Sequence, residues 1–124
     1  MNTVTFAEVE SKMIEIRGQQ VIIDSDVAEL YGVETREVNQ ALSRNLEKFP
    51  EGYIFELDAQ EKDELITNCD HLKKLKFSPS FPKAFTERGL YMLATILKSA
   101  KATATTLAII DTFAAKYTAS CPHI

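Results

Sequence analysis

The stretch that decides the fold runs from Asp24 to Ser43: Asp-Ser-Asp-Val-Ala-Glu-Leu-Tyr-Gly-Val-Glu-Thr-Arg-Glu-Val-Asn-Gln-Ala-Leu-Ser. Apolar residues recur at helical spacing on both sides of Gly32, and glycine suits the position after a helix because a positive φ is often needed there. The small Ala28 allows a second helix to cross closely, and Val33 can fill the angle between the two helices. The stretch therefore predicts two short helices joined by a tight turn, as in a helix-turn-helix unit.

The second helix of this pair is predicted to have an apolar face and a polar face. At 100° per residue, the apolar arc contains Val38, Ala41, Leu42, Asn45 and Phe49. The opposite arc contains Arg36, Asn39, Gln40, Ser43 and Glu47. Arginine can bind the O6 and N7 atoms of guanine bidentately, and asparagine or glutamine can pair with N6 and N7 of adenine. The polar arc therefore has the residue types that recognise base edges in the major groove.

The candidate DNA contacts of this helix include residues that flank the polar arc. The full set is Thr35, Arg36, Asn39, Gln40, Ser43, Arg44 and Lys48. Arg44 and Lys48 are placed to meet phosphates, and Thr35 is also the expected N-cap of the helix. The alternative is an ordinary solvated helix face, which Glu37 and Glu47 favour.

Length and composition indicate one small folded domain, because the chain has 124 residues of which 45% are apolar. No apolar run approaches the ~18 residues of a membrane span, and the N-terminus lacks the basic start and hydrophobic stretch of a secretion signal. We therefore expect a cytoplasmic protein. Two cysteines, Cys69 and Cys121, are too few for a disulfide framework.

The charge is divided unevenly along the chain, whose net charge is −4. Residues 1–64 carry 15 acidic and 6 basic side chains, a balance of −9, whereas residues 65–124 carry 3 acidic and 8 basic side chains, a balance of +5. The basic cluster in the second half consists of Lys73, Lys74, Lys76, Lys83 and Arg88. Phosphate attraction depends on the local field, so Lys73, Lys74 and Lys76 are candidate phosphate contacts. A solubilising loop is the alternative.

The residues before the helix pair predict a short hairpin. Residues 1–12 form a polar N-terminal segment that is expected to fray or to make a short helix. Residues 13–23 have strand character on both sides of a turn at Gly18-Gln19. Asp24 is the expected N-cap of the first helix, and Asp26 and Glu29 are expected to favour the same helix start rather than form a metal or catalytic cluster.

The residues after the pair predict a strand, a helix, a loop and two further helices. Residues 49–52 are a turn, and residues 53–57 are a strand expected to pair with the N-terminal hairpin. Asp58 and Glu61 predict a capping box for a helix through Ile66. Residues 67–83 are expected to form a long loop, followed by a short strand over residues 83–85.

The C-terminal part predicts a core helix capped by Thr86 and a last helix over residues 99–117. The last helix carries apolar residues on a wide arc, which indicates burial against the body and against a second copy of the chain. The predicted fold class is therefore α+β: a small helix-turn-helix-containing domain over residues 13–117, with a short β-hairpin or sheet and two C-terminal helices. Residues 118–124 are expected to be a tail.

Two blocks of this sequence resemble a known family. The first block comprises residues 21–35, Asn45, Phe49-Pro50 and residues 55–57, and the second comprises residues 85–89, Met92-Leu93 and Leu97. They resemble the DNA-binding N-terminal domain of phage antirepressors, that is, the KilA-N superfamily in its orf-six N-terminal branch. The similarity runs from Met13 to Phe113 and excludes residues 121–124.

This resemblance implies a small α+β DNA-binding module of phage and prophage genes, often fused to a C-terminal effector domain. No such effector domain is expected within these residues. The implied partner is double-stranded DNA, and the implied role is transcription regulation or antirepression.

Other chemistry has weaker support. Cys69, His71, Cys121 and His123 form two Cys-x-His pairs, but the spacing within each pair is shorter than in known structural zinc sites. We therefore expect no metal or cofactor. The sequence has no glycine-rich phosphate loop, no serine with a plausible base and only two histidines, so we expect no enzyme activity.

The rival hypothesis is a protein-interaction module. Antirepressors contact repressors, and the acidic first half of the chain could bind a repressor or another basic partner by imitating the charge of DNA. A third hypothesis is a dimerisation module that uses the last helix.

Overall fold

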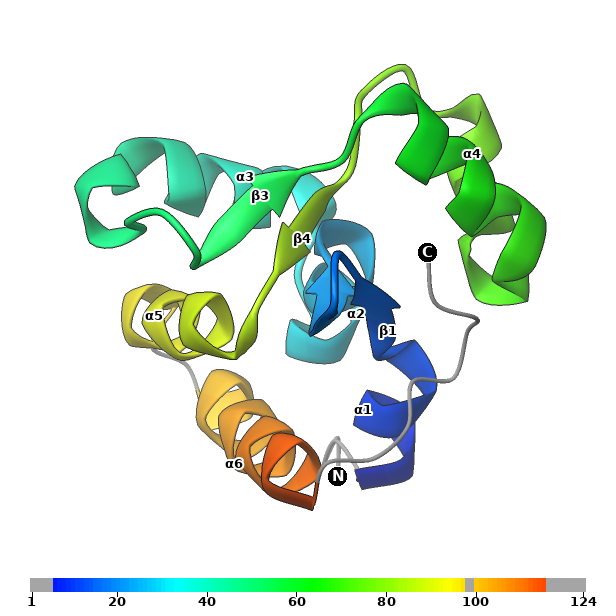
Figure 1. The fold of residues 1–124 in the computed structure, drawn as a ribbon. Coiled ribbons are helices and arrows are strands. Elements are labelled where there is room, and N and C mark those ends of the chain that lie inside the picture. The colour runs from blue at the N-terminus through cyan, green and yellow to red at the C-terminus, as the bar shows by residue number, and fades with distance from the viewer. Residues whose placement is uncertain (1–5, 98–99, 116–124) are drawn as a thin grey trace.

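The computed structural model describes residues 6–97 and 100–115 (Figure 1). Its elements in chain order are α1 (Phe6–Lys12), β1 (Ile14–Ile16), β2 (Gln19–Ile23), α2 (Asp24–Tyr31), α3 (Thr35–Arg44), η1 (Leu46–Lys48), β3 (Ile54–Glu56), α4 (Ala59–Asn68), η2 (Asp70–Phe77), β4 (Lys83–Phe85), α5 (Glu87–Leu97) and α6 (Ala100–Ala115). Elements η1 and η2 are 3₁₀ helices. The mixed α+β class is confirmed. None of the helices over the described ranges is long and apolar enough to cross a membrane.

The four strands form one antiparallel sheet in the order β1-β2-β4-β3. The predicted pairing of β3 with the N-terminal hairpin is wrong, because β4 lies between them. Ala84 and Phe85 of β4 are fully buried, whereas the residues of β3 are half-buried or exposed. The more deeply buried strand, β4, therefore occupies the interior of the sheet. The hairpin turn lies at Arg17 and Gly18, which have φ values of 55° and 76°, one residue earlier than predicted.

Two apolar clusters cover the two faces of β2, because successive residues of a strand point to opposite faces. Ile22 belongs to a cluster with Val38, Phe85 and Leu90, which joins the sheet to α3 and α5. Val21 and Ile23 belong to a second cluster beneath α4 and η2. In Figure 1, α4 lies above and to the right of the sheet, whereas α5 and α6 lie below it.

The turn between α2 and α3 follows the prediction from Gly32. This glycine has φ 73° and caps α2 through its backbone N–H, and the N–H of Val33 donates to Ala28 O at 2.9 Å. Val38 and Leu42 of α3 are buried, as the helical pattern predicted. The turn and these two anchors fix how α3 lies on the domain.

The predicted N-caps of α2 and α3 are wrong. The N-cap positions are Ile23 and Glu34, and neither makes a side-chain capping bond. Asp24 lies inside the first turn of α2 and accepts the Ser25 N–H at 2.8 Å. Thr35 is the first residue of α3.

The predicted loop over residues 67–83 is also wrong in its first half. The α4 helix, which begins with the predicted Asp58–Glu61 capping box, extends to Asn68, and η2 follows directly. Leu72 and Leu75 are buried and lie three residues apart, which is the period of a 3₁₀ helix. Burial of these leucines in the second cluster therefore gives this segment its structure.

The start of α5 packs closely on the turn before β3, where Thr86 makes hydrogen bonds and Gly89 allows the close approach. The Thr86 hydroxyl lies 2.8 Å from Tyr53 O and 2.9 Å from Gly52 O. A Cβ atom added at Gly89 would lie 2.2 Å from Tyr53 O. Only a glycine allows α5 to approach the Tyr53 backbone this closely.

Candidate nucleic-acid interface

The outward face of α3 is formed by exposed polar residues. Arg36, Gln40, Ser43 and Arg44 are exposed, and the side chain of Arg36 is 76% exposed. Val38 and Leu42 hold the opposite face of the helix in the core. The face predicted to meet bases is therefore open to a ligand over most of its length.

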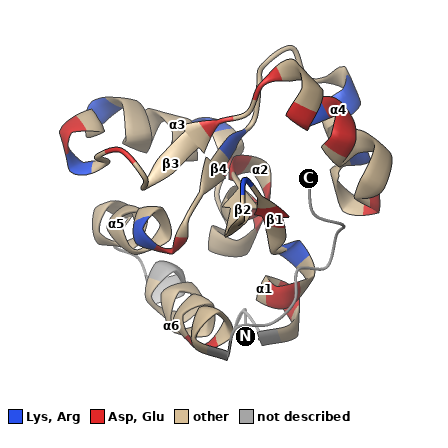
Figure 2. Ribbon diagram, in the orientation of Figure 1, with Lys and Arg blue, Asp and Glu red and all other residues tan. Residues whose placement is uncertain are grey.

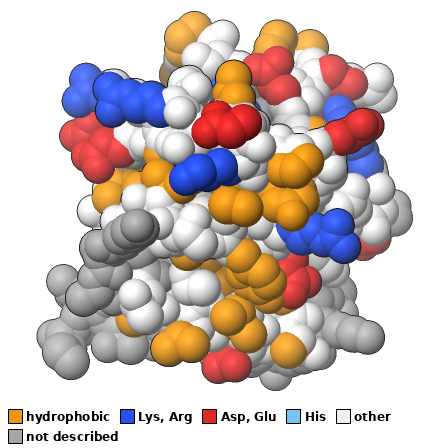
Figure 3. All heavy atoms as spheres, turned by 90° about the vertical axis from the view of Figure 1, so that its left-hand side faces the viewer, with side chains coloured by type: hydrophobic (Ala, Val, Ile, Leu, Met, Phe, Trp, Pro, Cys, Tyr) orange, Lys and Arg blue, Asp and Glu red, His pale blue; other side chains and the backbone are white. Residues whose placement is uncertain are grey.

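The charge around α3 is balanced. Between Glu34 and Lys48 the sequence has three acidic and three basic residues. The Arg36 guanidinium lies 3.3 Å from a carboxylate oxygen of Glu34. Blue and red segments follow one another at the left-hand end of α3 and in the turn after it (Figure 2), and the face in Figure 3 carries separate basic and acidic groups around hydrophobic side chains. The surface around α3 therefore carries no excess of positive charge.

Asn39 differs from its neighbours on the polar arc. Its amide nitrogen lies 3.2 Å from Asp24 Oδ2 and 3.2 Å from Thr35 O, and its Oδ1 atom is buried without a hydrogen-bond partner. Burial raises the pKa of Asp24, and the hydrogen bond from Asn39 opposes this rise. The amide of Asn39 is thus engaged in joining α3 to the start of α2, which argues against its predicted contact with adenine.

A pocket of ≈ 280 Å³ lies beside the N-terminal half of α3. Thr35 and Asn39 line one side of it. The other lining residues come from the start of α2, from η2 and from the segment that leads to β4: Asp24, Ser25, Lys74, Leu75, Ser78, Ser80, Phe81 and Pro82. The structure therefore brings the lysine-bearing segment next to the first two turns of α3.

Lys74 is held by carboxylates of α2. Asp26 is fully buried, and its Oδ1 atom lies 3.6 Å from Lys74 Nζ, while its Oδ2 atom lies 3.0 Å from His71 Nε2. Glu29 lies 2.7 Å from Lys12 Nζ and 3.4 Å from Lys74 Nζ, and the bond from Lys12 is the main cause that lowers the pKa of Glu29. The acidic residues of α2, which the sequence predicted to favour the helix start, instead bind basic groups from α1 and η2.

The other two lysines of the basic cluster have different surroundings. Lys73 Nζ lies 3.7 Å from Asp70 Oδ1, and both side chains are exposed. Lys76 Nζ lies 5.9 Å from the centroid of the Phe77 ring and, over residues 6–97 and 100–115, makes no ion pair with a carboxylate. Of the three predicted phosphate contacts, Lys76 is thus the most available to an external anion.

The residues after η2 were not predicted from the sequence to lie beside α3. Ser78, Ser80 and Phe81 lie next to α3, although more than 30 residues of sequence separate them from it. The sequence did contain one indication that this segment has a function, because residues 71–86 contain four lysines and no acidic residue.

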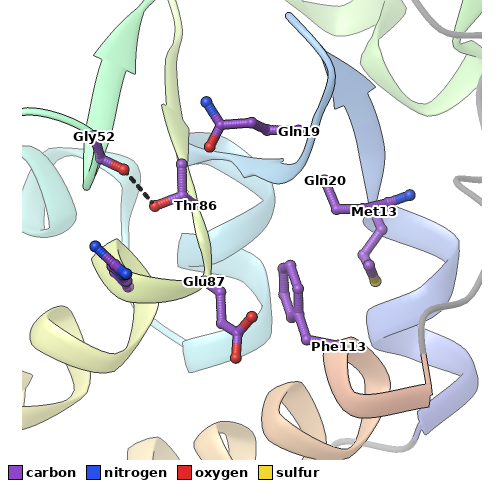
Figure 4. Close-up of a pocket in the computed structure, with 8 residues that line it drawn as sticks. Met13, Gln19, Gln20, Gly52, Thr86, Glu87 and Phe113 are labelled. Carbon is purple, nitrogen blue, oxygen red and sulfur yellow. Dashed lines mark hydrogen bonds between the residues drawn. The ribbon is translucent and has the colours of Figure 1, made fainter.

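A larger pocket of ≈ 630 Å³ lies elsewhere, between the hairpin, the start of α5 and α6 (Figure 4). Its lining residues are Met13, Gln19, Gln20, Gly52, Thr86, Glu87, Arg88 and Phe113. The Oε1 atom of Gln20 is buried without a hydrogen-bond partner. None of the predicted DNA contacts lines this pocket, so it is separate from the interface on α3.

The two Cys-x-His pairs, which were not expected to form a zinc site, lie in two different parts of the chain. Cys69 is buried and His71 bonds to Asp26, whereas Cys121 and His123 lie outside the described residues. Among the residues whose placement is described, no group of three or more His, Cys, Asp or Glu side chains could hold a metal ion.

The fold and this surface define a small α+β domain with an exposed polar helix. The family model for the ORF6N domain matches residues 11–96, and the chain belongs to this family, a phage-associated domain related to KilA-N and antirepressor-type families. No curated protein and no solved structure matches the chain. The resemblance to a phage-associated domain family is thereby confirmed at the level of the family.

Proposed function

We propose that this chain is a sequence-specific double-stranded DNA-binding module of a phage or prophage regulator or antirepressor. The α2 and α3 helices would act as a helix-turn-helix in the cytoplasm, by binding and not by catalysis. The observation that carries the proposal is the exposure of Arg36, Gln40 and Ser43 on one face of a helix whose other face is anchored by Val38 and Leu42.

The exposed residues divide into two roles in this proposal. Arg36 and Gln40 can each form two hydrogen bonds with a base edge, to guanine and to adenine respectively. Ser43 can donate to or accept from either base. Arg44 and Lys48, near the end of the helix, are placed to fix the register by contacting phosphates, which carry no sequence information.

A double substitution of Arg36 and Gln40 by alanine tests this proposal. Each bidentate base contact contributes about 1–3 kcal/mol of discrimination, so the variant should lose the sequence preference of the natural protein while its circular dichroism spectrum stays native. Selection from a pool of random duplexes measures the preference. Glu37→Ala is the matched control, because Glu37 is exposed on the same helix but outside the polar arc, and it should enrich the natural sequence. The same enriched sequence from the double variant would exclude α3 as the reading helix.

A protein partner is the second candidate, and the exposed carboxylates around α3 favour it. Glu34, Glu37, Glu47 and Glu51 are all exposed and could meet a basic surface on a repressor. The same selection separates the two candidates. Failure of the natural protein to enrich any duplex, together with binding to a repressor, would support the second.

A homodimer is part of the proposal because α6 leaves apolar side chains uncovered. Leu107 is 59% exposed and Ile110 is 38% exposed, whereas Ile109 is buried against the body. The dimer stays a prediction, which light scattering measures directly. Two copies of α3 in one assembly would match a DNA site with two half-sites.

A further inference from the structure

We infer that the segment from Ser78 to Pro82, here the 78–82 loop, is a second DNA-contacting element, with Phe81 as its apolar contact and Lys76 as its phosphate contact. This inference rests on the proposed function and adds a part of the interface that the helix pair does not supply. It follows from the position, rigidity and chemistry of the loop.

The residues that line the pocket beside α3 show where the loop lies. Ser78, Ser80 and Phe81 line that pocket together with Thr35 and Asn39 of α3. Thr35 and Asn39 lie at the edge of the polar arc that carries Arg36 and Gln40. A duplex that receives this arc in its major groove would therefore present the adjoining backbone and groove edge to the 78–82 loop.

The loop is held in one arrangement by α4 and by its own sequence. Lys62 Nζ of α4 donates to Ser78 O at 2.6 Å and to Ser80 O at 3.2 Å. The N–H of Leu57 donates to Pro82 O at 2.9 Å. Pro79 and Pro82 restrict the backbone further, because the proline ring fixes φ. Little ordering entropy would then be lost when the loop binds.

The chemistry of the loop suits nucleic acid more than a second protein surface. Phe81 is 44% exposed and lies against a groove of ≈ 560 Å³ whose charged lining residues are Lys62, Asp63 and Lys76. Lys62 Nζ lies 5.9 Å from the centroid of the Phe81 ring. An exposed aromatic ring in a groove that also contains Lys76 can pack on sugars and bases while the Lys76 ammonium group binds a phosphate. The nearly neutral surface around α3 makes such a source of positive charge necessary.

The test is a hydroxyl-radical footprint on the duplex that the natural protein selects, with Phe81→Ala as the main variant. The natural protein should protect a core read by α3 and an adjoining flank on one side. Phe81→Ala should lose the protection of the flank and about tenfold in affinity, which is the order of loss expected when one aromatic contact with the nucleic acid is removed. It should still enrich the same core sequence. Ser80→Asp, which places a carboxylate on the exposed loop, should have the same effect.

Phe77→Ala is the matched control. Phe77 is 84% exposed but lines none of the pockets beside α3 and α4, so its loss should leave the flank protected. An unchanged footprint and an affinity within about twofold for Phe81→Ala would overturn the inference, and so would an equal loss for Phe77→Ala. If the natural protein protects no duplex, the proposed function itself fails, and that result is distinct from the other two.

Discussion

At the scale of single residues, Asn39 and Gln40 are neighbours with different expected roles. Asn39 donates to Asp24 and Thr35, whereas Gln40 is exposed. We predict that Asn39→Ala lowers the free energy of unfolding by about 1 kcal/mol, because it leaves the buried Asp24 carboxylate with one hydrogen bond fewer. The sequence selected from random duplexes should stay the same.

Urea unfolding and duplex selection on Asn39→Ala and Gln40→Ala together check this prediction. Gln40→Ala should show the reverse pattern, with natural stability and a changed preference at one base pair. If Asn39→Ala instead changed the DNA sequence that is selected, Asn39 would have to contact a base after all.

The sequence could predict the arc on which Asn39 lies but not its partner. Helical periodicity at 100° per residue gives the direction of a side chain from the helix axis. The bond to Asp24 depends on how α2 and α3 cross, and the sequence predicted Asp24 as a helix cap instead. A long-range hydrogen bond of this kind depends on tertiary structure, and the helical periodicity of the sequence does not predict it.

At the scale of elements, the contact between α5 and the start of β3 leaves no room for a side chain at Gly89. A Cβ atom at this position would lie 2.2 Å from Tyr53 O and 3.2 Å from Ile54 Cγ2. We predict that Gly89→Ala lowers the free energy of unfolding by about 2 kcal/mol, because displacing α5 costs more than the roughly 1 kcal/mol that alanine gains in helix propensity. Chemical denaturation measures the change.

Thr95→Ala is the control for this prediction, because Thr95 is exposed on the same helix. Its effect should stay within about 0.5 kcal/mol. A Gly89→Ala variant as stable as the natural protein would show that α5 can move away from Tyr53 at little cost.

The elements themselves were largely predictable from local sequence. The hairpin, the helix pair, the capping box at Asp58 and the strand at Lys83 depend on residues that are close in the chain. The strand order and the η2 helix were not predictable in this way. Both depend on burial of Ala84, Leu72 and Leu75 against distant segments.

At the scale of the whole molecule, folding brings charged residues that are distant in the sequence into ion pairs. Lys74 is paired with Asp26 and Glu29, whereas Lys76 makes no ion pair within residues 6–97 and 100–115. We predict that Lys76→Ala reduces the slope of log affinity against log salt by about 0.9, the value for one lost phosphate contact. Lys74→Ala should leave this slope nearly unchanged and lower the free energy of unfolding at pH 7 by about 1 kcal/mol. Fluorescence anisotropy in a salt series and urea unfolding measure the two quantities.

The stability loss of Lys74→Ala should depend on pH in a defined direction. Lys12 and Lys74 lower the pKa of Glu29 in the folded protein, so their stabilising effect is complete above the unfolded pKa of about 4.3. It disappears as the pH falls through the lower folded pKa. The variant and the natural protein should therefore differ less at pH 3 than at pH 7, and a constant difference would exclude Glu29 as the relevant partner.

The uneven charge of the two halves was therefore only a partial guide to the surface. The balance of −9 before residue 65 and +5 after it counts residues that neutralise one another once the chain is folded. Arg17 and Glu61, and Lys12 and Glu29, pair within the first half, while Lys74 pairs with α2 across the halves. Lys76, which makes no ion pair within the described residues, lines the same groove as Phe81 of the 78–82 loop.

The buried Asp26 carboxylate has a consequence for protein engineering. It meets His71 at 3.0 Å, Lys74 at 3.6 Å and Lys12 at 4.0 Å, so three side chains from two separate parts of the chain, η2 and α1, converge on one acidic group. A synthetic peptide that comprised only α2 and α3, or a transplant of the two helices into a foreign scaffold, would leave this carboxylate without its counterions. The pair of helices α2 and α3 is therefore not transferable on its own, and a chimera that keeps the shape of the pair must also include α1 and η2 or replace Asp26 by an apolar residue.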